Sequence, residues 1–320
     1  MTESGGRRRV ANASVLAVAE FASRLVAFVA TAYLAVVLSP EQFGLVGFAF
    51  AVVTYLAVFV DVGVTDVGSR QVSREAGLGD VETLTAGITV VRIGVALGCL
   101  LVLAAAAPLL RPDRTGQLVI VLMSLLVLTA GLDVSWVYKG LGRSVRIGVS
   151  LVARRLCYAA LVFLFIRGPD DVVAVPLLQV AGETVGVVWL GFALLSAGFG
   201  AMTRRDLARA WATFRSSGSL MMAKLLRTSV VTLDVVLLGF LSTDYAVGIY
   251  SSSYRICFLV MALAGAVQVA YLPDVTRGEG SERRTAARRH LESSAALGVP
   301  IAVGGALVAG PLVELAFGSE

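Results

Sequence analysis

Twelve ionisable residues lie well inside stretches that are otherwise apolar. Seven of them are basic: Arg24, Arg92, Arg154, Arg155, Lys224, Arg227 and Arg255. Five are acidic: Glu20, Asp61, Asp133, Glu183 and Asp234, with Asp66 and Glu314 nearer the ends of their stretches. A charge at the centre of a membrane-spanning helix costs roughly 2.5–3.5 kcal/mol, so it faces a partner or water rather than lipid. Because the basic groups outnumber the acidic ones, the sequence predicts a cationic cavity that suits an anionic ligand.

The spacing of these groups places several of them on shared helix faces. The two polar stripes are Glu20, Ser23, Arg24 and Thr31, and Lys224, Arg227, Thr228 and Asp234. Residues three, four and eleven apart lie on one side of a helix with 3.6 residues per turn. Two interpretations remain open. Either Glu20–Arg24 and Arg227–Asp234 are pairs that neutralise each other, or the stripes line a hydrated cavity.

The elements that carry these residues are membrane helices. The chain has 320 residues, 57% of them hydrophobic and 15% charged, with a mean hydropathy of +0.84, which is too apolar for a soluble, disordered or nucleic-acid-binding chain. A bilayer core needs about 20 apolar residues of helix. We predict an all-α, polytopic membrane helix bundle of about nine spans: 12–38, 45–66, 84–107, 117–138, 147–166, 173–196, 219–241, 246–272 and 291–317.

The remaining basic residues predict the orientation of the chain. Seventeen of them fall in loops on the side of the N-terminus, and only Arg111, Arg114 and Arg167 fall on the other side, where we give them no role. This asymmetry is typical of a cytoplasmic N-terminus. We therefore expect a multi-pass protein of the cytoplasmic membrane, and the net charge of +5 indicates topology rather than a nucleic-acid partner.

Several kinds of chemistry have no residues to perform them. The single histidine, His290, and the three isolated cysteines do not form a triad, a metal site or a disulfide framework. The sequence has no Walker A motif and no nucleophile elbow. We expect no catalytic residue, no metal and no enzyme. Two small-residue pairs, Gly94/Gly98 and Gly182/Gly186, predict close helix packing.

An internal repeat divides the chain. LSPEQFGLVGFAF from Leu38 resembles LSTDYAVGIYSSSY from Leu241, so that Gly44 matches Gly248 and Arg70 matches Arg277. Parallel repeats of this kind build transporters whose site lies between two lobes. We predict a six-helix lobe at 1–196, a basic cytoplasmic linker at 197–218 and an incomplete three-helix lobe at 219–320.

The strings LSPEQFGLVGFAFAVVTYLAVFVDVGVTDVGSRQVSRE, DVSWVYKGLGR and LDVVLLGFLSTDYAVGIYSSSYRICFL resemble the polysaccharide-export flippases of the multidrug/oligosaccharidyl-lipid/polysaccharide superfamily. Members of that family have 12 to 14 helices, so the resemblance implies a C-terminally truncated member. It also implies a flippase that moves a prenyl-diphosphate-linked oligosaccharide across the membrane by alternating access.

That function gives the candidate residues their roles. The cations that would bind the diphosphate are Arg24, Arg92, Lys224, Arg227 and Arg255, and the acids that would pair with them or bind a coupling proton or Na⁺ are Glu20, Asp61 and Asp234. Expected partners are the lipid-linked oligosaccharide diphosphate, membrane lipids, a polysaccharide polymerase and glycosyltransferases, with no nucleic acid. The alternatives are a cation-coupled multidrug exporter, a non-transporting structural subunit of a glycan-assembly complex, and a membrane glycosyl-transferring enzyme. Arg154 and Arg155 could face the cavity or the headgroups, and their position near the inner end of their span favours the headgroups.

Overall fold

The computed structural model describes residues 3–74, 78–195 and 204–254, together with 285, 288, 291–292, 295–296, 298–300 and 303. Every regular element among these residues is helical, which confirms the predicted fold class. The elements are α1 (Glu3–Val37), α2 (Pro40–Asp61), α3 (Val64–Val72), α4 (Leu78–Leu110), α5 (Arg114–Leu132), α6 (Ser135–Gly140), α7 (Ser144–Phe165), η1 (Pro169–Val173), α8 (Ala174–Leu195), α9 (Arg204–Ser216) and α10 (Gly218–Leu241). Residues 244–254 form a further helical segment, called helix 244–254 below.

The membrane spans follow the predicted order. Six segments are long and apolar enough to cross a membrane: α1, α2 with α3, α4, α5 with α6, α7, and η1 with α8. The predicted span 219–241 coincides with α10, and 246–272 overlaps helix 244–254. The ninth predicted span, 291–317, falls mostly outside the described residues. The chain is a multi-pass membrane protein.

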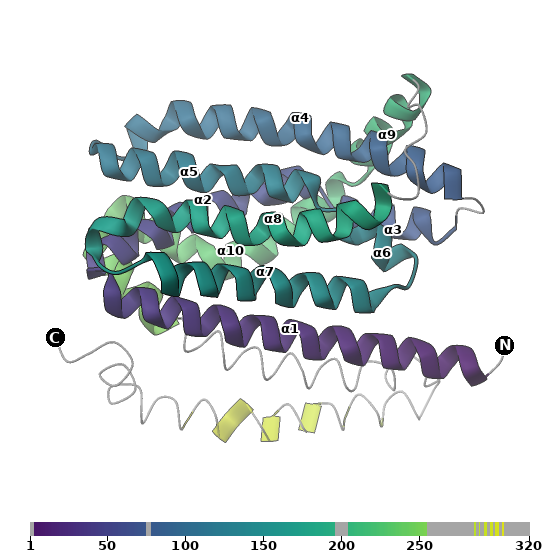
Figure 1. Cartoon of the computed structure of the whole chain (residues 1–320), viewed down its shortest axis with the longest axis horizontal. Helices are drawn as coiled ribbons and strands as arrows, with labels where there is room; N and C mark the ends of the chain where they lie inside the picture. Colours follow the sequence, from purple (N-terminus) through teal and green to yellow (C-terminus); the bar gives the residue numbers. More distant parts are fainter. Residues whose placement is uncertain are drawn as a thin grey trace.

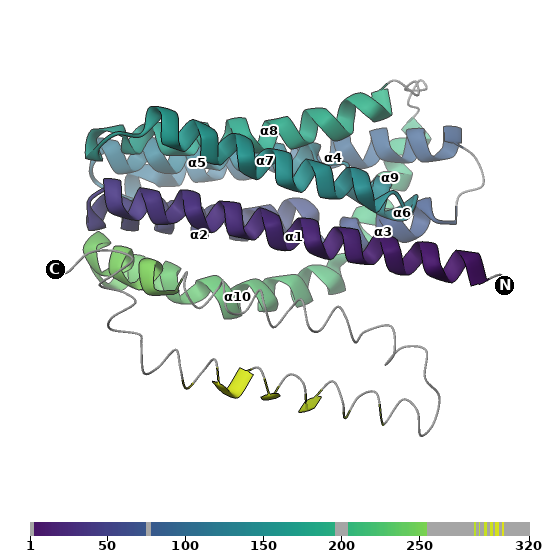
Figure 2. The same cartoon turned by 60° about the horizontal axis from the view of Figure 1, so that its bottom comes forward.

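The long helices lie side by side and roughly parallel (Figure 1). We call the end where α1 begins, which also holds α3, α6 and α9, the N-terminal end of the bundle. The opposite end holds the short connections at 38–39, 111–113 and 166–168. Helix α1 packs on α7, α7 on α8, α4 on α5 and α5 on α2. Helix α10 packs mainly against α2, along one side of the bundle (Figure 2).

The second span is broken where the sequence predicted a continuous helix over 45–66. Ser39 caps its start by accepting a hydrogen bond from the Gln42 amide, and Pro40 occupies the first turn, where no amide donor is needed. Near the N-terminal end, Val62 (φ 43°) and Gly63 (φ 78°) adopt left-handed conformations and separate α2 from α3. Glycine tolerates this conformation, whereas a β-branched valine is strained in it. The break directs Asp61 and Asp66 toward α10 (see below).

One predicted small-residue contact is present and the other is not. A methyl group on Gly182 would lie 2.8 Å from the Tyr158 Cβ, and one on Gly186 would lie 2.6 Å from the Arg154 Nε. Gly94 and Gly98 have no described atom within 4 Å of that position. The sequence spacing is the same in both pairs, so only the second pair is used to bring helices together.

Candidate functional site

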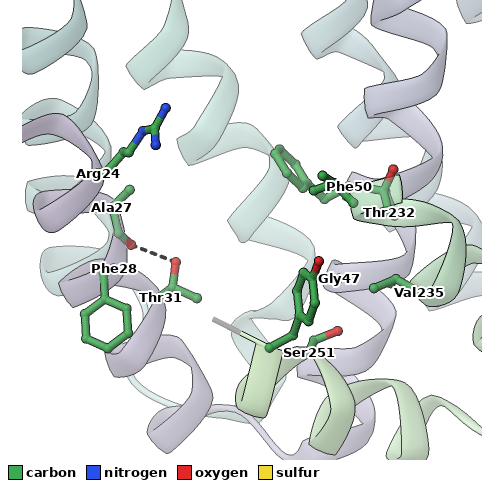
Figure 3. A pocket seen from close by; sticks show the side chains of 12 residues that line it. Arg24, Ala27, Phe28, Thr31, Gly47, Phe50, Thr232, Val235 and Ser251 are labelled. Atoms are coloured by element: carbon green, nitrogen blue, oxygen red, sulfur yellow. Dashed lines mark hydrogen bonds between the residues drawn. The ribbon is translucent and has the colours of Figure 1, made fainter. Parts of the chain in front are cut away.

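A cavity of about 280 Å³ lies between α1, α2, α10 and helix 244–254. Its lining includes Arg24, Phe28, Thr31, Phe50, Thr232 and Ser251. Figure 3 shows the α1 side chains on one side of the space and those of α10 and helix 244–254 on the other. The cavity therefore lies between elements of the two predicted lobes, which is where a transporter with two repeats holds its ligand.

Among the predicted binding cations that the structure describes, Arg24 alone lines this cavity. Its guanidinium is 3.9 Å from the Glu20 carboxylate, and the two side chains are 56% and 50% exposed. An ion pair this long and this exposed contributes little attraction. Arg24 is therefore available to bind an anion.

Arg227 is exposed, and it makes no ion pair or hydrogen bond that the described residues show. It lies one turn before Val231, which lines the cavity, and so shares its helix face. Arg227 and Asp234 do not form an ion pair, because they are seven residues apart and therefore lie about 10 Å from each other along the helix. Asp234 instead accepts a hydrogen bond from the Tyr250 hydroxyl.

Arg24 and Arg227 lie at similar depths in the bundle. Arg24 is 13 residues from the end of α1 and Arg227 is 14 residues from the end of α10. Both therefore lie about 20 Å from the opposite end, at 1.5 Å per residue.

Lys224 is held away from the cavity by two carboxylates. Its ammonium forms ion pairs with Asp61, and with Asp66 at 3.3 Å. Asp61 also accepts from the Thr65 hydroxyl, at 2.5 Å, and Asp66 also pairs with Lys139, at 3.3 Å. These contacts join the start of α10 to the α2–α3 break at the N-terminal end.

Arg92 is buried inside the bundle, with only 3% of the residue exposed. Its guanidinium donates to the backbone carbonyls of Asp133 (2.8 Å) and Ala130 (2.6 Å), and it lies 3.9 Å from the Asp61 carboxylate. Ala130 lies in the last turn of α5 and Asp133 is its C-cap, where the regular helical amides end; the Ala130 carbonyl also accepts a long bond of 3.4 Å from the Asp133 amide. Arg92 therefore completes the α5–α6 break, and it does not line the cavity.

Arg154 and Arg155 face the interior of the bundle rather than the headgroups. Glu183 bridges them, at 2.8 Å from Arg154 and 3.0 Å from Arg155, and Asp133 lies 3.4 Å from Arg154. All four line a second cavity, of about 230 Å³, between α2, α5, α7 and α8. Two acids balance two bases there, so this cluster has no formal net charge.

One ion pair at the opposite end involves residues to which the sequence gave no role. Arg111 bonds the Asp244 carboxylate at 2.5 Å and the Gly239 carbonyl at 3.2 Å, and it stacks on the Phe48 ring. Burial raises the pKa of the Asp244 carboxyl and the nearby Asp113 adds to this, although Arg111 acts in the other direction. No local pattern marks Arg111, because its partner is more than 130 residues away.

Beside this pair, α2 and helix 244–254 cross with their backbones in contact. A methyl group on Gly44 would overlap the Asp244 carbonyl, and one on Gly248 would overlap the Pro40 carbonyl. Each glycine thus faces the residue four positions before the other glycine. The two glycines matched by the sequence repeat therefore meet each other in a nearly symmetrical contact.

The structure thus divides the predicted site residues. Arg24 lines the cavity and Arg227 lies one turn away from it, whereas Lys224, Arg92 and Asp61 are bonded to one another or to backbone. Arg255 lies outside the described residues. No cluster of three or more metal-ligating side chains occurs in the part of the chain that the structure describes.

Comparisons with known proteins agree with this architecture. The family model described as "Polysaccharide biosynthesis protein" matches residues 10–277. A "Putative O-antigen transporter" of Escherichia coli (strain K12) is 24% identical over 273 residues, which are 83% of this chain. The chain spans 64% of the length of that relative.

Solved transporter structures share the fold. An inward-facing multidrug resistance transporter of the MATE family and MOP superfamily aligns with a TM-score of 0.68 at 15% identity, over 96% of this chain and 72% of the other. A MOP-superfamily transporter from Pyrococcus furiosus aligns with a TM-score of 0.61 at 15% identity, over 98% and 74%. At such identities the likeness concerns the fold. The family match covers most of the chain, and this multi-pass membrane protein belongs to the polysaccharide biosynthesis protein family.

Proposed function

We propose that this protein is a flippase that moves a prenyl-diphosphate-linked oligosaccharide across the cytoplasmic membrane by alternating access, and that it is not an enzyme. The observation that carries the proposal is the exposed guanidinium of Arg24 in the cavity lining, with the exposed Arg227 at a similar depth on α10, one turn from the lining residue Val231. A diphosphate needs fixed positive charge, and guanidinium groups bind phosphate oxygens in pairs. The prenyl chain would remain in the lipid.

The two lobes of the proposed cycle are residues 1–196 and 219–320, joined by 197–218, with the N-terminus in the cytoplasm. The Lys224 and Arg111 ion pairs join the lobes at the N-terminal end and at the opposite end respectively. Glu20 and Asp234 are the carboxylates that we propose for a coupling proton or Na⁺. Asp61 is already held by Lys224, so we assign it a positioning role.

The test is export in cells that lack their own flippase. We expect the variant Arg24→Ala with Arg227→Ala to reduce surface glycan at least tenfold and to leave lipid-linked glycan on the cytoplasmic side, measured by lectin binding and lipid extraction. The matched control is Arg114→Ala with Arg143→Ala, two exposed arginines at the bundle ends whose side chains bond no described residue. Unchanged export by the first variant, at equal protein level, would refute the proposal.

A multidrug exporter is the second candidate, because solved multidrug transporters share the fold. A cavity for cationic drugs needs a surplus of acidic groups, whereas this one is lined by Arg24. Drug efflux measured in the same cells separates the two functions. Efflux that persists in the double variant would favour the drug exporter.

A further inference from the structure

Helix α9 connects the two predicted lobes and carries apolar side chains on its outer surface. Leu207, Trp211 and Phe214 fall on one side of this helix, which we call the apolar flank of α9. Leu207 is 37% exposed and Trp211 is 53% exposed. The Trp211 ring stacks on the Phe214 ring, with centroids 5.6 Å apart. The flank therefore faces outward rather than into the bundle.

The packing of α9 on α4 fixes the depth of this flank. A methyl group on Gly87 of α4 would lie 3.0 Å from the Ala210 Cβ, so the two helices touch at this level. Gly87 lies about 9 Å inside the apolar span Val81–Leu110. This span has 30 residues and is about 45 Å long, close to the thickness of a bilayer with its headgroup layers. Ala210 and the adjacent Trp211 thus lie near the boundary between headgroups and hydrocarbon.

Tryptophan is a residue that favours this boundary, because its ring is apolar while its indole N–H bonds headgroups or water. A second exposed tryptophan, Trp189 of α8, lies near the end of the apolar span Pro169–Phe192, at the same end of the bundle. A water-soluble protein partner would have to enter the headgroup layer to reach the apolar flank of α9. The depth therefore favours lipid as its occupant.

The charges around the flank indicate the kind of lipid. Helix α9 contains four arginines and one aspartate. The Gln71 amide of α3 donates to the Thr213 hydroxyl at 3.2 Å, which brings the end of α3 beside α9. Guanidinium groups bind phosphate oxygens, and clustered arginines at a membrane surface attract anionic lipids. The exposed arginines on the two elements are Arg70, Arg74, Arg209 and Arg215.

We propose that α9 is an interfacial helix that binds anionic phospholipid headgroups. Arg215 lies one turn after Trp211 on the same side of the helix, so the ring enters the edge of the hydrocarbon while the guanidinium reaches a headgroup. Ser217 is buried directly after α9 and donates to the Thr213 carbonyl at 2.8 Å, which holds the start of α10 to α9. The lipid contact thereby sets the level at which the second lobe enters the bilayer. This inference does not depend on the proposed function.

The first test measures the depth of Trp211 in the full chain, reconstituted in phosphatidylcholine and phosphatidylglycerol vesicles. The chain has three tryptophans, and Trp136 is only 1% exposed. A Trp189→Phe background therefore leaves Trp211 as the exposed emitter. We expect phospholipids brominated near the top of their acyl chains to quench its fluorescence, and the further change Trp211→Phe to remove most of this quenching. Quenching by aqueous iodide without quenching by brominated lipid would overturn the proposal.

The second test measures the preference for anionic lipid at the same site. Quenching of Trp211 by brominated phosphatidylglycerol is compared with quenching by brominated phosphatidylcholine. We expect phosphatidylglycerol to be preferred at low salt, and Arg215→Gln to lower that preference about fivefold. The matched control is Arg114→Gln, an exposed arginine at the opposite end of the bundle, which should keep the preference. Equal quenching by both lipids in the unmodified protein, or an unchanged preference in Arg215→Gln, contradicts the anionic lipid site.

Discussion

Arg92 and Arg24 carry the same group on the third and first spans, yet their surroundings give them different roles. Arg92 is 3% exposed and bonds two backbone carbonyls, whereas the Arg24 side chain is 56% exposed beside a distant carboxylate. A buried guanidinium is retained only where its partners are arranged around it. Position in the bundle, rather than residue type, therefore decides which arginine is free to meet a ligand.

Replacing Arg92 tests its structural role. We expect Arg92→Met to destabilise the protein by about 3 kcal/mol, because it removes one partner from a buried, hydrogen-bonded group. The measurement is the thermal unfolding midpoint of the detergent-solubilised protein. Arg143→Ala, at an exposed position, is the control and should unfold close to the unmodified protein. An Arg92→Met midpoint equal to that control would contradict the structural role.

At this scale, the sequence could predict which charges are buried in the membrane but not how they pair. Lys224 bonds Asp61, a residue more than 160 positions away, and Arg92 bonds carbonyls of another helix. Such contacts depend on the packing of whole helices. Only the spacing within one helix is visible in the sequence, and it wrongly suggested Arg227–Asp234 as one of the possible pairs.

Helix α2 and helix 244–254 approach each other so closely that only glycine fits where they cross. We expect Gly44→Ala to lower the unfolding midpoint, because the added methyl group would overlap the Asp244 carbonyl. Overpacking a core costs about 1–3 kcal/mol, and we expect this variant to lose about 2 kcal/mol or more of unfolding free energy. Gly98→Ala is the matched control. It lies in the open and gains helix propensity, so it should leave the midpoint unchanged or raise it.

If the Gly44→Ala and Gly98→Ala variants unfold at the same temperature, the close backbone contact at the crossing does not contribute to the stability of the protein. A partial rescue by lengthening the connection at 242–243 would point to strain at the crossing itself. Both outcomes are read from the same unfolding experiment.

The order of the elements was predictable, and their interruptions were not. Apolar stretches of about 20 residues predicted the spans, because length and hydropathy are local properties. Helix α9 falls in the segment predicted as a linker, where its mean hydropathy is too low for a span. It forms because Ala210 and Thr213 are buried against α4 and Gln71, and this packing is tertiary.

At the scale of the whole molecule, the basic residues gather at one end. Lys139 and Arg209, for example, lie in or beside the short helices α6 and α9 at the N-terminal end. From the positive-inside rule we therefore predict that this end is cytoplasmic. The structure gives the relative arrangement of the ends, and their side of the membrane stays a prediction.

Reporter fusions test this orientation. We expect green fluorescent protein fused after Arg74 to fluoresce and alkaline phosphatase fused there to be inactive, because both would be cytoplasmic. The same reporters fused after Arg167 should give the reverse result. The opposite pattern at both positions would show that the N-terminus is outside.

The crossing of Gly44 and Gly248 also has a consequence for how the protein is made. About 200 residues separate the two glycines. At 5–20 residues per second, a ribosome needs about 10–40 s to reach the second glycine after the first. During that time the start of α2 is already in the membrane without the helix that it will cross, so another group must cover its glycine face until helix 244–254 is inserted.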